Sequence, residues 1–223
     1  MKYSPSQENY IKAVYHLQLE NSTVTTNALA QALDTRPASV TDMLKKLKLQ
    51  KLLLYEKYRG VKLTAEGRRL AVQIIRKHRL WEFFLVNTLR FGWEEVHEIA
   101  EELEHIGSGK LVDRLDAFLG FPQHDPHGDP IPDRLGKLPA GPHSTLSEMP
   151  LHRHAVVRGI GDQRPVMLDL LRDQQIALGT KLEVQKKFLV DGSVQIKIRG
   201  RQPVNISAYA AKNILVGYDK KKP

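Results

Sequence analysis

The chain has 223 residues, a formal net charge of +9 and no cysteine. The lack of cysteine excludes disulfides, thiolate catalysis and thiolate metal ligands, and no apolar run is long enough to predict a transmembrane helix. The first residues contain no apolar signal core, so we expect a cytoplasmic protein. Residues 36–79 contain thirteen Lys and Arg against three Asp and Glu, whereas residues 82–116 contain three against nine. This asymmetry indicates one part that binds a polyanion and another that binds cations.

The beginning of the chain predicts a helical domain. Ser4, Pro5 and Gln7 are typical of a capping box at the start of a helix. Residues 25–53 then predict two helices joined by a tight turn, with Pro37 at the start of the second helix. This arrangement is a helix-turn-helix, which alone is a weak indication of DNA binding.

A basic hairpin strengthens that interpretation. Residues 52–55 and 61–63 predict short strands, with Gly60 at the turn between them, and Thr64 caps a further helix. Helix, helix, recognition helix and hairpin together predict a winged helix-turn-helix.

The rest of the chain predicts a helical segment, a linker and a β-rich domain. The helix around residues 74–91 is apolar on nearly all sides, which indicates burial in a subunit interface. Residues 123–150 carry six of the twelve prolines, a linker composition. Residues 151–218 alternate in hydrophobicity and predict a small barrel with a hairpin turn at residues 191–192.

The stretch "HEIAEELEH", residues 97–105, raises the question of a metal site. One face of the expected helix carries His97, Glu101, Glu104 and His105. On the preceding helix, a histidine and a glutamate stand four residues apart and so also share a face. A single pair is most often an ordinary ion pair, but six such residues on adjoining helices favour a metal site. They are His78, Glu82, His97, Glu101, Glu104 and His105. His124 and His127, in "HDPH", are interpreted as linker histidines.

Six stretches show a resemblance to a known family: "SQENYIKAVYHL", "RPASVTDMLKKL", "LLYEKYRG", "RKHRLWEFFLV", "HEIAEELEH" and "HGDPIP". They span almost the whole chain, which resembles the diphtheria-toxin-repressor family of metal-dependent transcriptional regulators and its manganese-sensing branch. The resemblance implies one metal site at His78, Glu82 and His97. It implies a second at Glu101, Glu104 and His105, completed by Asn9 of the first helix.

The chain departs from the family pattern in its first helix. Asn9 stands where manganese-type members have Asp. Glu101, by contrast, agrees with the manganese-type members, whereas iron-type members have Cys at that position. Lys12 stands where the small two-domain manganese repressors have a further carboxylate ligand, which puts their closely spaced pair of metals in doubt. The barrel of iron-type members also lends ligands to the first site. Asp162 or Gln163 are the candidates here, and a polar turn is the alternative.

The ligand types indicate which metal to expect. Carboxylates and imidazoles without sulfur suit Mn²⁺ or Fe²⁺, whereas Zn²⁺ prefers fewer ligands in a tetrahedral arrangement. We expect Mn²⁺, with Fe²⁺ as the alternative.

The expected protein is a homodimeric repressor of α+β class that controls metal homeostasis by binding operator DNA. Residues 1–73 are expected to form the winged helix-turn-helix, 74–142 the helical dimerisation and metal-sensing domain, 143–150 a linker, and 151–223 an SH3-like barrel of the FeoA type. The expected DNA contacts are Arg36, Pro37, Ser39, Thr41, Asp42 and Lys45 in the major groove, with Lys46, Arg59 and Lys62 on phosphates.

A membrane or a small-molecule substrate is not expected. The rival hypotheses are a metallohydrolase that uses the same His and Glu residues, and a DNA-binding protein without a metal.

Overall fold

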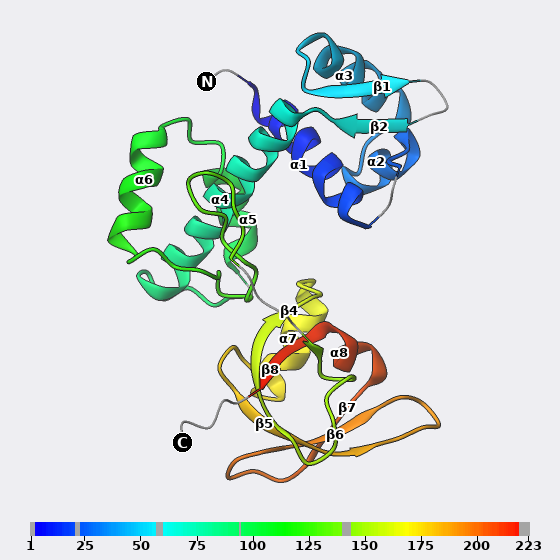
Figure 1. Ribbon diagram of the computed structural model, residues 1–223, viewed down its shortest axis with the longest axis vertical. Helices are drawn as coiled ribbons and strands as arrows, with labels where there is room; N and C mark the ends of the chain where they lie inside the picture. Colours follow the sequence, from blue (N-terminus) through cyan, green and yellow to red (C-terminus); the bar gives the residue numbers. More distant parts are fainter. Residues whose placement is uncertain (1–2, 21–22, 57–59, 94, 140–143, 219–223) are drawn as a thin grey trace. The chain divides into compact units, whose positions relative to one another are not determined.

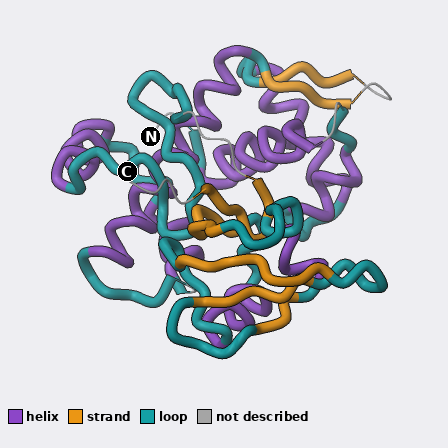
Figure 2. Tube along the Cα trace, turned by 60° about the horizontal axis from the view of Figure 1, so that its bottom comes forward, coloured by secondary structure: helices purple, strands orange, loops and turns teal. Residues whose placement is uncertain are grey.

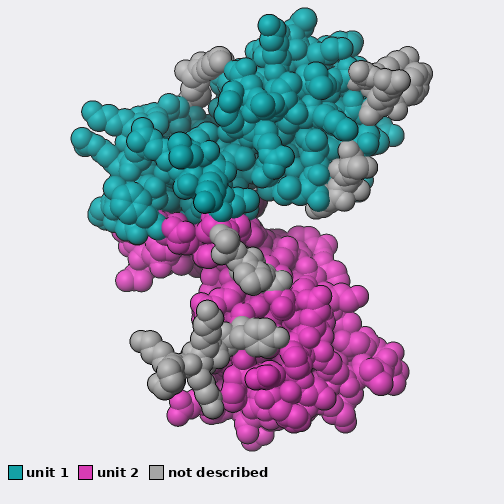
Figure 3. Space-filling model, viewed as in Figure 1, with its two compact units in different colours: residues 1–81, 98–121, 131–138 teal, residues 82–97, 122–130, 139–223 magenta. Residues whose placement is uncertain are grey.

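The computed structural model describes residues 3–20, 23–56, 60–93, 95–139 and 144–218. It divides into two compact units: unit 1 contains residues 1–81, 98–121 and 131–138, and unit 2 contains residues 82–97, 122–130 and 139–223 (Figure 3). Within the described residues, no helix combines the length and the apolar character needed to cross a membrane.

Unit 1 begins with the expected winged helix-turn-helix (Figure 1). Its helices are α1 (Pro5–Glu20), α2 (Thr26–Ala32) and α3 (Pro37–Leu49), followed by strands β1 (Leu53–Glu56) and β2 (Gly60–Leu63). The expected capping box is present: the backbone N–H of Ser4 donates to Gln7 Oε1 at 3.0 Å, and that of Gln7 donates to Ser4 Oγ at 3.3 Å. The largest fully buried side chains of this core are Ile11, Leu29, Leu44, Leu47, Leu52 and Leu53.

The long helix α4 (Ala65–Asn87) follows the antiparallel β1–β2 pair, which aligns Leu53 with Leu63. Thr64 caps it, because its Oγ1 accepts from the N–H of Gly67 at 3.1 Å and donates to the carbonyl of Lys51 at 2.8 Å. The predicted cap is therefore confirmed.

Two short helices complete the helical part of the chain: α5 (Val96–Leu103) and α6 (Gly109–Phe118). Because α5 ends at Leu103, the expected helix over residues 97–105 is too long, and Glu104 and His105 lie in the turn that follows. The expected ligands of this stretch do not form one solvated face, because Glu104 is fully buried whereas His97 and Glu101 are exposed. Within unit 1, Arg76 of α4 pairs with Asp116 of α6 at 2.7 Å.

Unit 2 is built on an antiparallel six-stranded sheet (Figure 2). In spatial order its strands are β3 (Ser144–Thr145), β8 (Ile214–Tyr218), β4 (His154–Ile160), β5 (Lys181–Lys187), β6 (Val194–Ile198) and β7 (Val204–Ile206). The strands expected in the sequences of β4, β5 and β6 are confirmed, as is the turn at Gly192, which has a φ of 72°.

Two short helices in unit 2 were not foreseen: α7 (Pro165–Asp173) and α8 (Ala208–Asn213). Proline opens α7, and Ser207 caps α8 by accepting from the N–H of Ala210. Both are shorter than the window over which a helical period is distinct, and both lie among β-rich stretches. They contribute Met167, Leu168, Leu171, Ala210 and Ala211 to the core beneath the sheet.

Candidate metal centre and DNA-binding surface

Three acidic or imidazole side chains of unit 2 converge in a buried group, which we call the inner cluster: Glu82 of α4, Asp125 and His127. Each offers a ligand atom, and these atoms all lie within 4.8 Å of one another. The relative exposures are only 1% for Glu82, 3% for Asp125 and 0% for His127. Two carboxylates in such a site repel each other unless a cation or a proton compensates them.

The loop that carries Asp125 and His127 is rigidly placed. Asp125 Oδ1 accepts from the backbone N–H groups of His127 at 2.8 Å and Asp129 at 2.9 Å. Gly128 has a φ of +90°, and a Cβ there would lie 2.0 Å from the carbonyl oxygen of Arg158 in β4. Glycine is therefore required at this position, because it lets the loop backbone pack directly on the strand.

The imidazole of His127 is held in one orientation. Its Nε2 donates to the carbonyl oxygen of Trp93 at 2.7 Å, so Nδ1 carries the lone pair in the neutral ring. Nδ1 lies 3.7 Å from Glu82 Oε1, longer than a hydrogen bond. A second hydrogen bond that fixes the tautomer is the usual support of a ligating histidine. The ring also stacks on Trp93, with centroids 5.9 Å apart.

The surroundings shift the pKa of His127 upward. Burial lowers it, but Glu82, Asp125 and the carbonyl of Trp93 together raise the pKa above its ordinary value of 6.5. The interpretation of His127 as a linker histidine did not foresee its full burial, and a role as a metal ligand stays a prediction. The partners of the His127 ring, Glu82 and the carbonyl of Trp93, are distant in sequence. The only local indication of an ordered turn was the proline and glycine of "HDPHGDP".

The sequence-expected ligands of the first site are placed around Glu82. His97 Nδ1 lies 3.4 Å from Glu82 Oε1, and the His97 side chain is 51% exposed. His78 stands one helical turn before Glu82 in α4, so both share a face of that helix. His78 Nδ1 lies 2.8 Å from Glu104 Oε2 in unit 1.

The second expected set is assembled in unit 1, with additional partners. His105 Nδ1 lies 2.7 Å from Glu8 Oε2, and Lys12 Nζ donates to Glu104 Oε1 at 2.6 Å and to Glu101 Oε1 at 3.2 Å. The Oδ1 atom of Asn9 is buried without a hydrogen-bond partner among the described residues. Sequence reasoning missed Glu8 and did not foresee these contacts of Lys12.

Burial and charge act in opposite directions on Glu104. Burial raises its pKa, but contacts with His78 and Lys12 outweigh this effect, so the pKa is lowered from its ordinary value. Glu104 is therefore a buried carboxylate that this part of the chain keeps ionised.

The two barrel candidates have protein partners within unit 2. Arg164 donates to both oxygens of Asp162, at 3.0 and 2.8 Å, and the hydroxyl of Tyr209 donates to Oδ2 at 2.8 Å. The guanidinium of Arg164 beside it lowers the pKa of Asp162 to about 2. Gln163 donates to Asp129 Oδ2 at 2.9 Å, so it holds the loop of the inner cluster.

The expected DNA contacts lie mostly on the surface of α3 and the wing. Exposed side chains are Arg36, Pro37, Ser39, Asp42, Lys45, Lys46 and Lys62. Thr41 is half-buried and donates to the carbonyl of Pro37 at 3.0 Å, while Lys45 pairs with Asp42 at 3.1 Å. Arg59 lies outside the described residues. A surface depression lined by Asp34, Thr35, Arg36 and Ser39 marks the start of α3.

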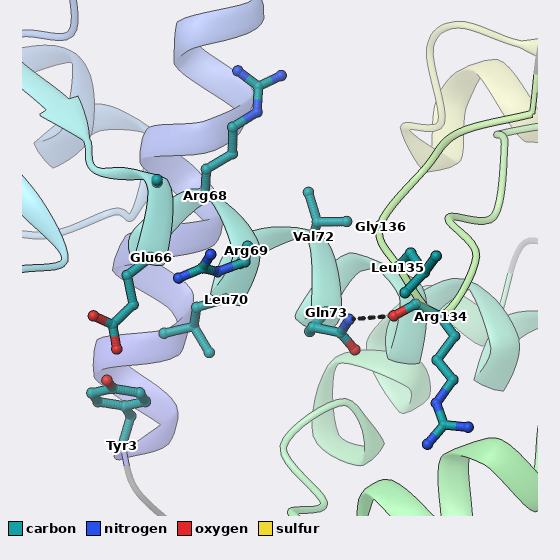
Figure 4. A pocket seen from close by; sticks show the side chains of 11 residues that line it. Tyr3, Glu66, Arg68, Arg69, Leu70, Val72, Gln73, Arg134, Leu135 and Gly136 are labelled. Atoms are coloured by element: carbon teal, nitrogen blue, oxygen red, sulfur yellow. Dashed lines mark hydrogen bonds between the residues drawn. The ribbon is translucent and has the colours of Figure 1, made fainter.

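Unit 1 also has a pocket of about 690 Å³ beside the first turns of α4 (Figure 4). It is lined by Tyr3, Arg68, Arg69, Leu70, Gln73, Arg134 and Leu135 among others, and Gln73 donates to the carbonyl of Arg134 at 3.2 Å. None of the expected metal ligands, and no residue of the inner cluster, lines it. The pocket is therefore separate from the candidate metal centre.

The fold and these groups define a winged-helix DNA-binding protein with a candidate metal centre. Residues 2–61 match the model of the iron dependent repressor N-terminal DNA binding domain, 64–133 that of the iron dependent repressor metal binding and dimerisation domain, and 144–217 that of the FeoA domain.

Three similar proteins extend this result. The iron-dependent repressor IdeR of Mycobacterium tuberculosis is 31% identical over 212 residues, which cover 89% of this chain and 91% of that protein. The HTH-type transcriptional regulator MntR of Geobacillus kaustophilus is 35% identical over 122 residues, covering 55% of this chain and 86% of that protein. A structure described as a manganese-dependent transcriptional repressor in complex with manganese has a TM-score of 0.82, at 35% identity, over 95% of this chain and 99% of that one.

The chain belongs to the diphtheria-toxin-repressor family of iron-dependent repressors. The expected fold class is thereby confirmed: a winged helix-turn-helix, a helical metal-binding and dimerisation domain, and an SH3-like FeoA domain.

Proposed function

We propose that this protein is a cytoplasmic, homodimeric transcriptional repressor that binds operator DNA when Mn²⁺ is bound, and so controls metal homeostasis. The observation that carries the proposal is the inner cluster, a fully buried set of two carboxylates and one oriented imidazole in a chain with a basic winged helix-turn-helix. Similar proteins named as iron- and manganese-dependent repressors support it.

The residues that would hold the metal are those of the inner cluster together with His97, which lies 3.4 Å from Glu82 Oε1 in the same unit. A divalent cation supplies the positive charge that offsets the repulsion between buried carboxylates. The chain's contribution is to hold Nε2 of the His127 imidazole on the carbonyl of Trp93, which leaves Nδ1 facing Glu82, and to exclude water from the carboxylates. Oxygen and nitrogen donors without sulfur suit Mn²⁺, and Fe²⁺ is the alternative metal.

The exposed surface of α3 would read DNA in the major groove through Arg36, Pro37, Ser39, Thr41, Asp42 and Lys45. Lys46, Lys62 and Arg59 would contact phosphates, which carry no sequence information but set the register of the protein on the duplex. The half-buried aromatic side chains of α4, Trp81, Phe83 and Phe84, support a second copy of the chain as a partner.

By linkage, a metal that raises DNA affinity must itself bind more tightly in the presence of DNA. Metal binding would shift the dimer towards its DNA-binding state only to the extent that the metal binds this state more tightly than the state that does not bind DNA.

The rival hypothesis of a metallohydrolase lacks support. Such an enzyme needs a substrate pocket at the metal ligands. The pocket of about 690 Å³ in unit 1 is lined by none of them, and the family is one of repressors.

The test uses chelator-treated protein and a DNA sequence selected from random duplexes in the presence of Mn²⁺. We expect tight binding with Mn²⁺ and only weak, salt-sensitive binding in EDTA, measured by fluorescence anisotropy. Glu82→Gln should lose the response to Mn²⁺, whereas Glu98→Gln, an exposed position on α5, should keep it. Equal affinity of the wild-type protein in Mn²⁺ and in EDTA contradicts the proposal.

A further inference from the structure

Unit 1 contains a group of charged side chains from α1, α4 and the end of α5, which we call the lysine cluster: Glu8, Lys12, Lys77, Glu101, Glu104 and His105. Its centre is Glu104, whose side chain is fully buried. Lys12 Nζ lies 2.6 Å from Glu104 Oε1 and 3.2 Å from Glu101 Oε1, and its own side chain is only 15% exposed. The 2.6 Å contact joins residues 92 positions apart and so connects α1 with the end of α5.

The lysine cluster coincides with the family's second metal site. There, the resemblance implies a divalent ion held by Glu101, Glu104, His105 and the residue at Asn9. In this chain His105 Nε2 lies 3.8 Å from Glu104 Oε1, so these two residues could hold such an ion together. Lys12 donates to that same oxygen and to Glu101 as well. The ammonium group therefore competes directly for the expected carboxylate ligands.

Charge balance favours the ammonium over a divalent ion. The cluster has three carboxylates, on Glu8, Glu101 and Glu104, and two ammonium groups, since Lys77 Nζ lies 3.9 Å from Glu8 Oε2. These five groups sum to a net charge of −1, so a divalent cation would reverse it to +1. Asn9 adds no compensating charge where a manganese-type ligand is an aspartate. Like charges in a mostly buried group destabilise one another.

We propose that the Lys12 ammonium takes the place of the second metal ion, so that α1 is tied to the end of α5 without metal and each chain binds one ion fewer than the two-site pattern implies. This inference rests on the proposed function, because it leaves the inner cluster as the site through which Mn²⁺ acts. α1 also supplies Ile11 and Val14 to the core of the helix-turn-helix, so the same tether holds the DNA-binding domain.

The experiment measures Mn²⁺ stoichiometry per chain by equilibrium dialysis on the full-length protein. Wild type should bind one ion, and Glu82→Gln should bind none. Lys12→Met combined with Asn9→Asp should bind two, and adding Glu82→Gln to that pair should reduce the number to one. Lys12→Arg keeps the charge and should retain the single ion. Arg172→Met is the control, because Arg172 also pairs with a carboxylate, that of Asp169 at 2.6 Å, but is largely exposed and lies outside the expected DNA contacts.

Thermal unfolding in EDTA gives a second readout. Lys12→Met should unfold at a lower temperature than wild type, because it leaves Glu104 as a buried carboxylate without its ammonium partner. Mn²⁺ should restore much of that loss in Lys12→Met combined with Asn9→Asp. Lys12→Arg and Arg172→Met should unfold close to wild type.

Several outcomes overturn the inference. They are a wild-type stoichiometry of two, an ion retained by Glu82→Gln, or no additional ion in a folded protein that carries both Lys12→Met and Asn9→Asp. A wild-type protein that binds no Mn²⁺ contradicts the proposed function instead. In that case Lys12→Met with Asn9→Asp must still create a site, and its failure to do so rejects the role of Lys12 as well.

Discussion

Replacing His127 with alanine removes the only imidazole of the inner cluster while leaving both carboxylates in place. The substitution eliminates the proposed ligand nitrogen, Nδ1, which lies 3.7 Å from Glu82 Oε1, and it eliminates the hydrogen bond of 2.7 Å to the carbonyl of Trp93. Two effects follow, one on the metal and one on the fold, and they are measured separately.

The effect on metal binding should be the larger. Loss of a group that merely supports a metal ligand costs about 10- to 100-fold in affinity, so loss of the ligand itself should cost about 100-fold or more. A factor of 100 corresponds to about 2.8 kcal/mol. In the metal-free protein, the carbonyl of Trp93 loses its partner in a buried place, which costs about 1–3 kcal/mol.

The assay is a competition titration of Mn²⁺ against a fluorescent chelator, with thermal unfolding in EDTA as the measure of stability. His124→Ala is the matched control, because it changes the other histidine of "HDPH" and His124 belongs to neither group of potential ligands among the described residues. The reasoning is refuted if His127→Ala binds Mn²⁺ as tightly as wild type, or if the two alanine variants lose the same affinity.

Other expectations concern pH, DNA and the scaffold. Because His127 must release its proton to bind metal and its pKa is raised, Mn²⁺ affinity should fall by about tenfold per pH unit below that pKa, and a flat profile would contradict this assignment. Lys46→Ala should reduce the slope of log affinity against log salt by about two per dimer, one per subunit, with no change in sequence preference; an unchanged slope argues against a phosphate contact. Thr64→Ala should lower the stability of unit 1 by about 1 kcal/mol in thermal unfolding, since it removes the cap of α4. Gly128→Ala should destabilise unit 2 and weaken Mn²⁺ binding, because its Cβ would lie 2.0 Å from a backbone oxygen of β4; wild-type behaviour in both assays would show that the loop can move away.

Much of the helical part of the chain could be predicted from local patterns. The Ser4–Gln7 capping box, Pro37 at the start of α3 and the Thr64 cap act between residues three or four apart, a spacing that a sequence displays directly. The winged hairpin and three strands of the sheet followed from alternation and turn residues. Helical spacing predicted the six expected His and Glu ligands on adjoining faces, and their role in metal binding stays a prediction.

The composition of the two clusters was decided by tertiary structure. Nothing local distinguishes His124 from His127, yet only His127 meets Glu82, because the required glycine packs its loop on β4 and Trp93 holds its ring. The sequence showed only that Lys12 replaces an expected carboxylate ligand, because its contact with Glu104 spans 92 positions. The sequence by itself determined most of the helices and strands, α7 and α8 excepted, and which residue types could hold a cation. Which carboxylate receives a histidine and which receives a lysine depends on contacts between distant segments, whose energies arise only when burial removes water from both partners.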